Sequence, residues 1–168
     1  QSLNTGDGGV SIWRFRRERL SEDVTASYTP PPAFGRFRVL HQVGAGTLGP
    51  VFRGHDPDEG RLVALKVFRL DITPEKAAEL AAALASLVEL GLVHPGIVTP
   101  REAGVEGAVA YLASDYASAD SLDAAVRQYG PAPFQHALNM LTRLAGALDF
   151  AAAVGAFHGA LHSRDILV

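Results

Sequence analysis

The alternation of apolar and polar positions predicts strands in the first half of the chain, from residue 34 onward. Phe37 and Val39 alternate with polar neighbours, as in a strand that is buried on one face. Residues 51–54 resume this extended pattern after a glycine-rich turn, and residues 62–68 form a Val- and Leu-rich run typical of a buried strand. These three segments, joined by short polar turns, predict consecutive strands of one sheet.

Helical periodicity appears after the third predicted strand. Thr73 is a good N-cap, Pro74 suits the first helical position, and Gly91 can end the helix that they begin. Ser121 can open a short helix, and residues 134–154 predict a long one with an apolar stripe on one face. The stripe consists of leucines at spacings of three and four: Leu138, Leu141, Leu144 and Leu148.

Two further strands are predicted between the first helix and the later ones, at residues 97–98 and 109–113. The predicted order is therefore three strands, one helix, two strands and then helices. Strands and helices that form separate runs, rather than alternating βαβ units, favour an α+β fold with an antiparallel sheet. The sequence thus predicts a five-stranded antiparallel sheet with one helix, followed by a mainly helical part.

Residues 1–33 are predicted to form a flexible arm or linker. The first nine residues are polar and glycine-rich, a basic patch surrounds Trp13, and three prolines at residues 30–32 favour an extended backbone. The basic patch could contact an anionic membrane surface if a tether lay outside this stretch, but a solvated linker is the preferred interpretation. The start at Gln1 and the apolar end at residues 166–168 predict that the chain is a piece of a longer protein.

Composition limits the possible classes of protein. The 168 residues are 48% hydrophobic and 20% charged, which is enough apolar material for a core. The net charge of −3 gives no general footprint for nucleic acid, and no apolar run approaches the roughly 20 residues that span a bilayer. The chain has no cysteine, which excludes disulfides and thiolate metal sites and fits a cytoplasmic location. We therefore expect no nucleic-acid partner and no membrane span.

Gly44, Gly46 and Gly49 form a G-x-G-x-x-G motif, which alone is a weak signal. The dinucleotide-binding version needs a helix directly after the glycines, whereas here the next residues continue as a strand. The remaining interpretation is a hairpin that lies over a nucleotide, with the glycine backbone close to phosphates and Val51 against adenine. It predicts a lysine on the next strand, and the sequence V-A-L-K ends at Lys66; the alternative is a β-meander with a solvent-facing lysine.

With this hairpin and lysine, the chain resembles the eukaryotic-like Ser/Thr protein kinases of bacteria. V-A-L-K stands for the family's V-A-I-K, and residues 94–98 (HPGIV) resemble the H-P-N-I-V entry to its fourth strand. Residues 111–116 and the following Ser121 are similar to the fifth strand, the hinge and the start of the next helix. The resemblance covers residues 34–168 and implies a kinase N-lobe at 34–116 and the start of a truncated C-lobe at 117–168.

The resemblance implies that ATP binds between the hairpin and the hinge. Ser114 would be the gatekeeper, and the backbone from Asp115 to Ala117 would hydrogen-bond adenine. The nucleotide-binding residues that it implies are Val43, Gly44, Gly46, Gly49, Val51, Ala64, Lys66, Ser114, Asp115, Ala117 and Leu167.

The segment HGALHSRD resembles the family's catalytic loop, H-R-D-L-x-x-x-N, and begins at His158. In that frame Ala160 stands in place of the proton-accepting aspartate, and Gly159 in place of the arginine. His162 takes the position of the loop lysine. Asp165 replaces the metal-binding asparagine and could still hold Mg²⁺, because hard cations favour carboxylate oxygen. No intact catalytic residue is therefore expected.

A kinase lysine is held by a glutamate of the first helix, and the family spacing to this glutamate falls on Ala83 or Ala85. Neither residue is acidic. Glu79 is the expected substitute and Glu89 the other candidate, although a solvated helix position is the simpler interpretation of Glu79.

These positions predict a pseudokinase: a kinase-like domain that binds ATP, with Mg²⁺ as a possible cofactor, and has weak or no phosphoryl transfer. Its role would then be regulatory or that of a scaffold for a protein partner that the sequence does not identify. Two alternatives stay open. One is an active Ser/Thr kinase with an unusual catalytic loop, and the other is an interaction module that binds no nucleotide.

Overall fold

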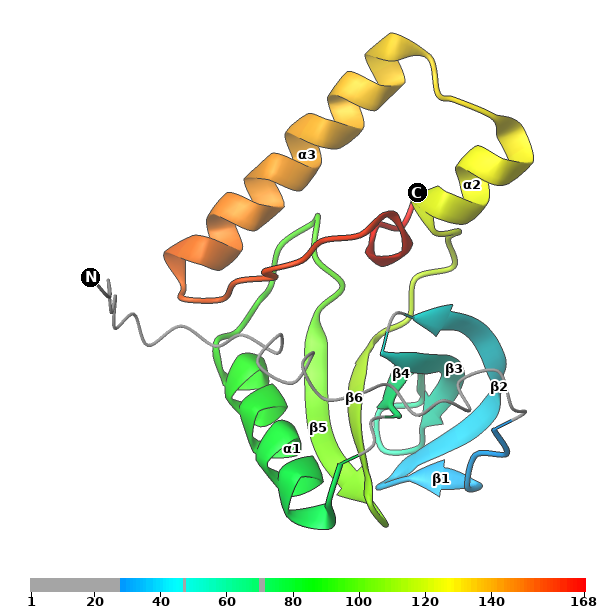
Figure 1. Ribbon diagram of the computed structural model, residues 1–168, viewed down its shortest axis with the longest axis vertical. Coiled ribbons are helices and arrows are strands. Elements are labelled where there is room, and N and C mark those ends of the chain that lie inside the picture. The colour runs from blue at the N-terminus through cyan, green and yellow to red at the C-terminus, as the bar shows by residue number, and fades with distance from the viewer. Residues whose placement is uncertain (1–27, 47, 70–71) are drawn as a thin grey trace.

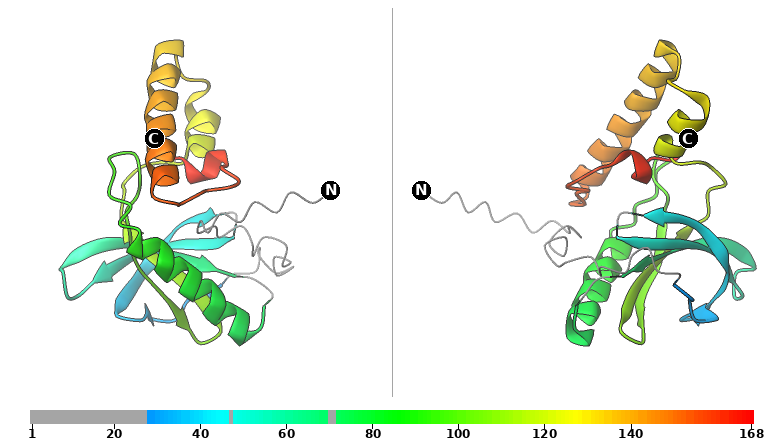
Figure 2. Two further views of the ribbon diagram at one scale, coloured as in Figure 1. Left: turned by 90° about the vertical axis from the view of Figure 1, so that its left-hand side faces the viewer. Right: turned by 45° about the vertical axis from the view of Figure 1, so that its right-hand side comes forward.

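The computed structural model describes residues 28–46, 48–69 and 72–168. A β-sheet with one helix forms one part of the molecule, and two helices and the C-terminal segment lie together at one end of the sheet (Figures 1 and 2). The elements, in chain order, are β1 (Ala33–Phe34), β2 (Phe37–Gly46), β3 (Gly49–Asp56), β4 (Arg61–Phe68), α1 (Pro74–Glu89), β5 (Pro100–Glu106), β6 (Val109–Asp115), α2 (Leu122–Tyr129), α3 (Phe134–Ala153) and a 3₁₀ turn (Ser163–Asp165).

All neighbouring strands of the sheet are antiparallel, in the order β1-β2-β3-β4-β6-β5. The predicted α+β class and antiparallel sheet are therefore confirmed. The sheet has six strands rather than five because the two-residue strand β1 folds back on β2, pairing Phe34 with Phe37. Gly35 makes this tight reversal with a φ of 54°, a backbone conformation that residues other than glycine rarely adopt.

The prediction of a strand at residues 97–98 is wrong, because Ile97 ends a turn, Val98 lies in the loop after it, and β5 begins only at Pro100. The turn uses the hydrogen-bonding groups that a strand would need. The His94 carbonyl accepts the N–H of Ile97 at 2.9 Å, and His94 Nδ1 accepts the N–H of Gly96 at 3.0 Å. Local side-chain bonding of this kind competes with sheet pairing.

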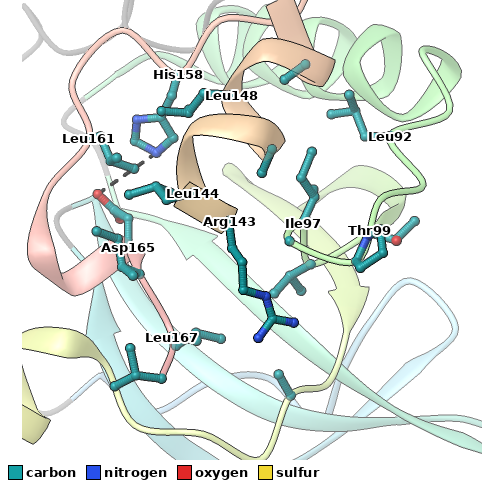
Figure 3. A pocket seen from close by; sticks show the side chains of 18 of the residues that line it. Leu92, Ile97, Thr99, Arg143, Leu144, Leu148, His158, Leu161, Asp165 and Leu167 are labelled. Carbon is teal, nitrogen blue, oxygen red and sulfur yellow. Dashed lines mark ion pairs between the residues drawn. The ribbon is translucent and has the colours of Figure 1, made fainter. Parts of the chain in front are cut away.

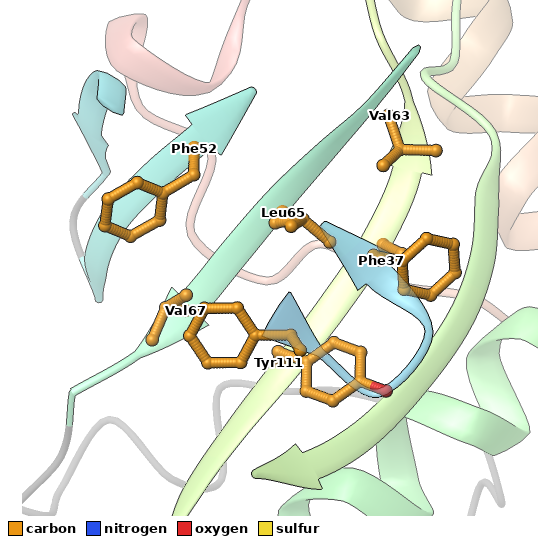
Figure 4. Close-up of a cluster of buried hydrophobic side chains, with 8 residues drawn as sticks. Phe37, Phe52, Val63, Leu65, Val67 and Tyr111 are labelled. Atoms are coloured by element: carbon orange, nitrogen blue, oxygen red, sulfur yellow. The ribbon is translucent and has the colours of Figure 1, made fainter. Parts of the chain in front are cut away.

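The core has one layer on each face of the sheet. On one face, residues of β1 to β4 and β6 gather in a single cluster (Figure 4): Phe34, Phe37, Phe52, Val63, Leu65, Val67, Tyr111 and Ala113. On the other face, Leu48 and Phe68 pack with Leu80 and Leu84 of α1. The alternation of β4, which sends Val67 to one layer and Phe68 to the other, is what the period of two along a strand requires.

Helix α1 starts as predicted. Thr73 Oγ1 accepts the N–H of Lys76 at 3.4 Å, Pro74 is the first helical residue, and Gly91 follows the helix with a φ of 63°. The loop after α1 then anchors α3. The His94 ring stacks on Phe150 with centroids 5.2 Å apart. This loop joins the sheet to the helical part.

The C-terminal segment is fixed beside α2. Ser121 Oγ caps the helix by accepting the N–H of Ala124 at 3.2 Å. The N–H of Leu122 donates to the Ile166 carbonyl at 2.8 Å, and the N–H of Val168 donates to the Asp120 carbonyl at 2.9 Å. These bonds hold the predicted catalytic-loop segment close to the sheet, between α2 and α3 (Figure 1).

Most of the predicted leucine stripe of α3 is uncovered: Leu138, Leu141 and Leu148 are exposed. In the described part of the chain, no helix combines the length and the hydropathy that a membrane span needs. Residues 1–27 of the predicted arm, including the basic patch, lie outside the described residues. Tyr28 is described, and its ring lies 6.1 Å from the Phe52 ring, so the end of the predicted linker packs on the sheet.

Candidate functional site

The glycine-rich hairpin joins β2 to β3 and lies directly on β4. Gly46 pairs with Gly49 across the turn. A Cβ added to Gly46 would lie 3.5 Å from Lys66 Cε, and one added to Gly49 would lie 2.1 Å from the Val67 carbonyl oxygen. Gly49 also has a φ of +144°. A Cβ on Gly44, by contrast, would meet no described atom within 4 Å.

The sheet register brings several of the predicted nucleotide-binding residues together. Val51 pairs with Lys66 across β3 and β4, and Ala64 pairs with Ser114 across β4 and β6. Directly paired residues project from the same face of a sheet, and residues two apart along β4 share that face as well. Val51, Ala64, Lys66 and Ser114 therefore form one patch beside the hairpin. Val43 is on the neighbouring strand β2 and is exposed.

Lys66 is partly buried and ion-paired. Its Nζ lies 3.9 Å from Asp165 Oδ1. Its side chain is 28% exposed. Burial lowers the pKa of Lys66 below its ordinary value, and the Asp165 carboxylate offsets part of this shift. Lys66 is thus held by Asp165 of the C-terminal segment, which was predicted to be the catalytic loop.

Helix α1 offers no acid to Lys66 on its packed face. The buried residues of α1 are all apolar: Ala77, Leu80, Ala81 and Leu84. Glu79 and Glu89 are both exposed. The solvated interpretation of Glu79 is therefore the one that the structure bears out, and Ala83 and Ala85 bring no charge to the site.

Asp165 is held in place by its own turn. Its Oδ2 accepts the N–H of His162 at 3.1 Å, while His162 Nδ1 accepts the N–H of Arg164 at 3.2 Å. These two reciprocal bonds form a capping box on the 3₁₀ turn. His158 Nε2 lies 4.0 Å from Asp165 Oδ2 (Figure 3), and burial lowers the pKa of His158. The spacing His-x-x-Asp was visible in the sequence, and it could have predicted this capping box.

The hinge segment is braced by arginines that the sequence analysis did not single out. Asp115 accepts two hydrogen bonds from Arg101, at 2.8 and 2.7 Å, and lies 3.5 Å from Arg61. The bonds from Arg101 hold the pKa of Asp115 below its ordinary value. The Asp115 N–H donates to the Thr99 carbonyl at 3.0 Å, so that N–H cannot also serve adenine. Ala117 is exposed just beyond.

A cavity of about 880 Å³ lies between the hinge, α3 and the C-terminal segment (Figure 3). Four predicted site residues line it: Asp115, Ala117, Asp165 and Leu167. Its α3 wall is mainly apolar and includes Leu144. The hairpin glycines, Val51, Ala64, Lys66 and Ser114 are not among its lining residues. Lys66 therefore lies beside this cavity, whereas Asp165, its ion-pair partner, and Arg143 are charged residues of the lining itself.

Ala160, which the resemblance puts at the position of the proton acceptor, has only a methyl group and can accept no proton. Within residues 28–46, 48–69 and 72–168, no three His, Cys, Asp or Glu side chains gather as a metal site. Mg²⁺ commonly binds through one or two carboxylates together with phosphate oxygens and water. Asp165 alone therefore fits a cation that arrives with a nucleotide, and does not fit a resident metal ion.

The chain matches the protein kinase domain family over residues 37–168 and belongs to that family. Serine/threonine-protein kinase PknK of Mycobacterium tuberculosis is 30% identical over 133 residues, 79% of this chain and 12% of that protein. PknA of the same species is 30% identical over 141 residues, 80% of this chain and 32% of that protein.

A similarity of the same kind extends to another genus and to a solved structure. The probable serine/threonine-protein kinase PknB of Lactococcus lactis is 27% identical over 134 residues, 79% of this chain and 21% of that protein. The crystal structure of the PknI kinase domain of M. tuberculosis is similar with a TM-score of 0.66 and 25% identity, covering 81% of this chain and 56% of that one. The chain thus has the fold of bacterial eukaryotic-like Ser/Thr kinases. It spans a third or less of the length of PknK, PknA and PknB.

Proposed function

We propose that this kinase domain binds ATP and has weak or no phosphoryl transfer, acting as a pseudokinase with a regulatory or scaffolding role. The observation that carries the proposal is the contrast between two positions of the site. Lys66 lies beside the glycine-rich hairpin and forms an ion pair with Asp165, while Ala160 takes the position of the proton acceptor. Groups that bind phosphate are retained and the group that removes a proton is absent.

Each retained group has a defined task in nucleotide binding. Val51 and Ala64 provide an apolar surface for the adenine ring on the sheet face. The carbonyl of Asp115 and the N–H of Ala117 are the backbone groups we assign to its polar edge. Lys66 donates to phosphate oxygens, and Gly46 leaves room for them beside its Cε.

Asp165 would hold Mg²⁺ together with the nucleotide, and the cation would supply charge neutralisation of the phosphates. His162, at the position of the loop lysine, uses Nδ1 in the turn, which restricts its contact with a phosphate to Nε2. His158 lies beside Asp165 and supports the loop. None of these groups takes over the task of Ala160, and loss of general-base help slows transfer by about 10²- to 10⁴-fold.

The proposal extends to the organisation of the chain. Residues 34–116 form the N-lobe, and residues 117–168 begin the C-lobe. We propose a cytoplasmic location and a protein partner or substrate.

Two measurements on the full chain test the proposal. ATP with Mg²⁺ should raise the melting temperature in wild type, because a ligand at about 100 times its Kd stabilises the folded state by about 2.7 kcal/mol. Lys66→Met should abolish the rise. Transfer of labelled γ-phosphate should be no greater in wild type than in Lys66→Met.

The outcomes separate the three functions. Phosphate transfer that disappears in Lys66→Met identifies an active kinase, the activity for which the similar mycobacterial proteins PknK and PknA are named. A melting temperature that does not respond to ATP identifies an interaction module.

A further inference from the structure

The charge of Lys66 is balanced from an unexpected direction. Its ion pair joins β4 to the C-terminal segment, with Nζ 3.9 Å from Asp165 Oδ1. The buried face of α1 is apolar, and Glu79 and Glu89 are exposed. A partly buried ammonium is stable only near an anion or another strong acceptor. Among the described residues, Asp165 is the acid that forms an ion pair with it.

The two oxygens of Asp165 have separate tasks. Oδ2 accepts the N–H of His162 at 3.1 Å and lies 4.0 Å from His158 Nε2, so it holds the turn. Oδ1 faces Lys66. The side chain is only 10% exposed, which limits screening by water. The carboxylate is therefore placed to fix the lysine and to act on any anion that the lysine binds.

We propose that Asp165 is the positioning residue of Lys66, and that its charge makes ATP binding at this site dependent on a divalent cation. This inference rests on the proposed ATP-binding function. Without a cation, Asp165 competes with the phosphates for Lys66 and repels them. Once a divalent cation neutralises it, Asp165 no longer opposes the phosphates.

The test compares the affinity for ATP in excess EDTA and in Mg²⁺, measured by calorimetry on the full chain. The variants are Asp165→Asn and, as a matched control, Asp149→Asn, which makes the same change at an exposed position of α3. An asparagine at residue 165 can still accept the N–H of His162, so the turn is kept while the charge is lost. A single cooperative melting transition in each variant confirms that the variants fold.

In EDTA, Asp165→Asn should bind ATP at least about fivefold more tightly than wild type. A factor of about five in affinity corresponds to the repulsion between two like unit charges about 4 Å apart in bulk water. The gain on adding Mg²⁺ should be large in wild type and in Asp149→Asn, and at least about fivefold smaller in Asp165→Asn. An affinity in EDTA that is unchanged or weaker in Asp165→Asn overturns the inference.

A second measurement without ligand separates this inference from the proposed function. Lys66→Met, Asp165→Asn and the double variant form a cycle of melting temperatures. If Lys66 and Asp165 interact, the melting temperature should fall less in the double variant than the sum of the decreases in the two single variants. Additive decreases overturn the inference that Asp165 positions Lys66. If ATP binds under no condition, the proposed function and the cation dependence both fail, while the cycle still decides whether Asp165 positions Lys66.

Discussion

The third glycine of the hairpin motif, Gly49, should contribute strongly to the stability of the fold, whereas the first, Gly44, should not. An alanine Cβ at Gly49 would lie 2.1 Å from the Val67 carbonyl oxygen and 3.1 Å from the Arg69 nitrogen, in a backbone with φ of +144°. Both neighbours are main-chain atoms of or directly after β4, so they cannot move aside as a flexible side chain would. Gly44 has a φ outside the positive range and open space around its Cβ position.

The magnitude follows from these two causes. The left-handed backbone alone costs an alanine about 1–2 kcal/mol, and relieving the clash requires the hairpin to shift away from β4. We expect Gly49→Ala to lower the free energy of unfolding by about 2–4 kcal/mol in total. Gly44→Ala should raise it slightly, by up to about 1 kcal/mol, because alanine restricts the unfolded chain more than glycine does.

Urea unfolding followed by circular dichroism measures both variants against wild type. A shift of the midpoint to lower urea in Gly49→Ala, without one in Gly44→Ala, is the expected result. Equal midpoints for the two variants would contradict the reasoning, because the two substitutions are chemically identical and differ only in their surroundings.

Two further predictions concern the braces of the fold. Arg101→Ala should cost about 0.5–1 kcal/mol at pH 7, since its bidentate bond to Asp115 is partly exposed. The folded-state pKa of Asp115 is lowered, so this contribution is complete above the unfolded pKa and is lost as pH falls through the folded one. Denaturation at pH 7 and below pH 3.8 should therefore show the difference shrinking with acid, and a constant difference would exclude the ion pair as its cause. Thr73→Ala should cost about 1 kcal/mol by removing the cap of α1, whereas Thr73→Ser, which keeps the oxygen, should cost much less in the same assay.

Features with local causes could be predicted from the sequence. The strand around Lys66 was predicted because Val and Leu repeat with a turn before them, and α1 because Thr73 and Pro74 mark its start. The strand predicted at residues 62–68 corresponds to β4, and the predicted helix corresponds to α1. Lys66 was therefore placed on the correct strand, directly after the hairpin. Each of these predictions depends on residues within one or two turns of the chain.

Features that depend on contacts between distant segments could not be predicted in the same way. Glu79 was the candidate partner of Lys66 because it is acidic and in α1, although a solvated position was the simpler interpretation. Asp165, far along the chain, forms the ion pair instead. Periodicity gives the face of a helix but not its rotation relative to a particular strand residue. The strand expected at residues 97–98 failed for the opposite reason, because a very local turn, made by His94, overrode β-prone residues.

The pairing of Lys66 with Asp165 separates two tasks that a glutamate on α1 would combine. In the described residues, α1 is held by apolar contacts, with Leu80 and Leu84 in the layer that also contains Leu48 and Phe68. Lys66 is held by the carboxylate of Asp165, which belongs to the 3₁₀ turn near the C-terminal end of the chain. A movement of α1 would therefore disturb packing without removing the counter-charge of Lys66, whereas a movement of the 3₁₀ turn would remove that charge directly. Control of the proposed nucleotide binding is thus expected to act through the C-terminal segment and its contacts with α2, rather than through α1.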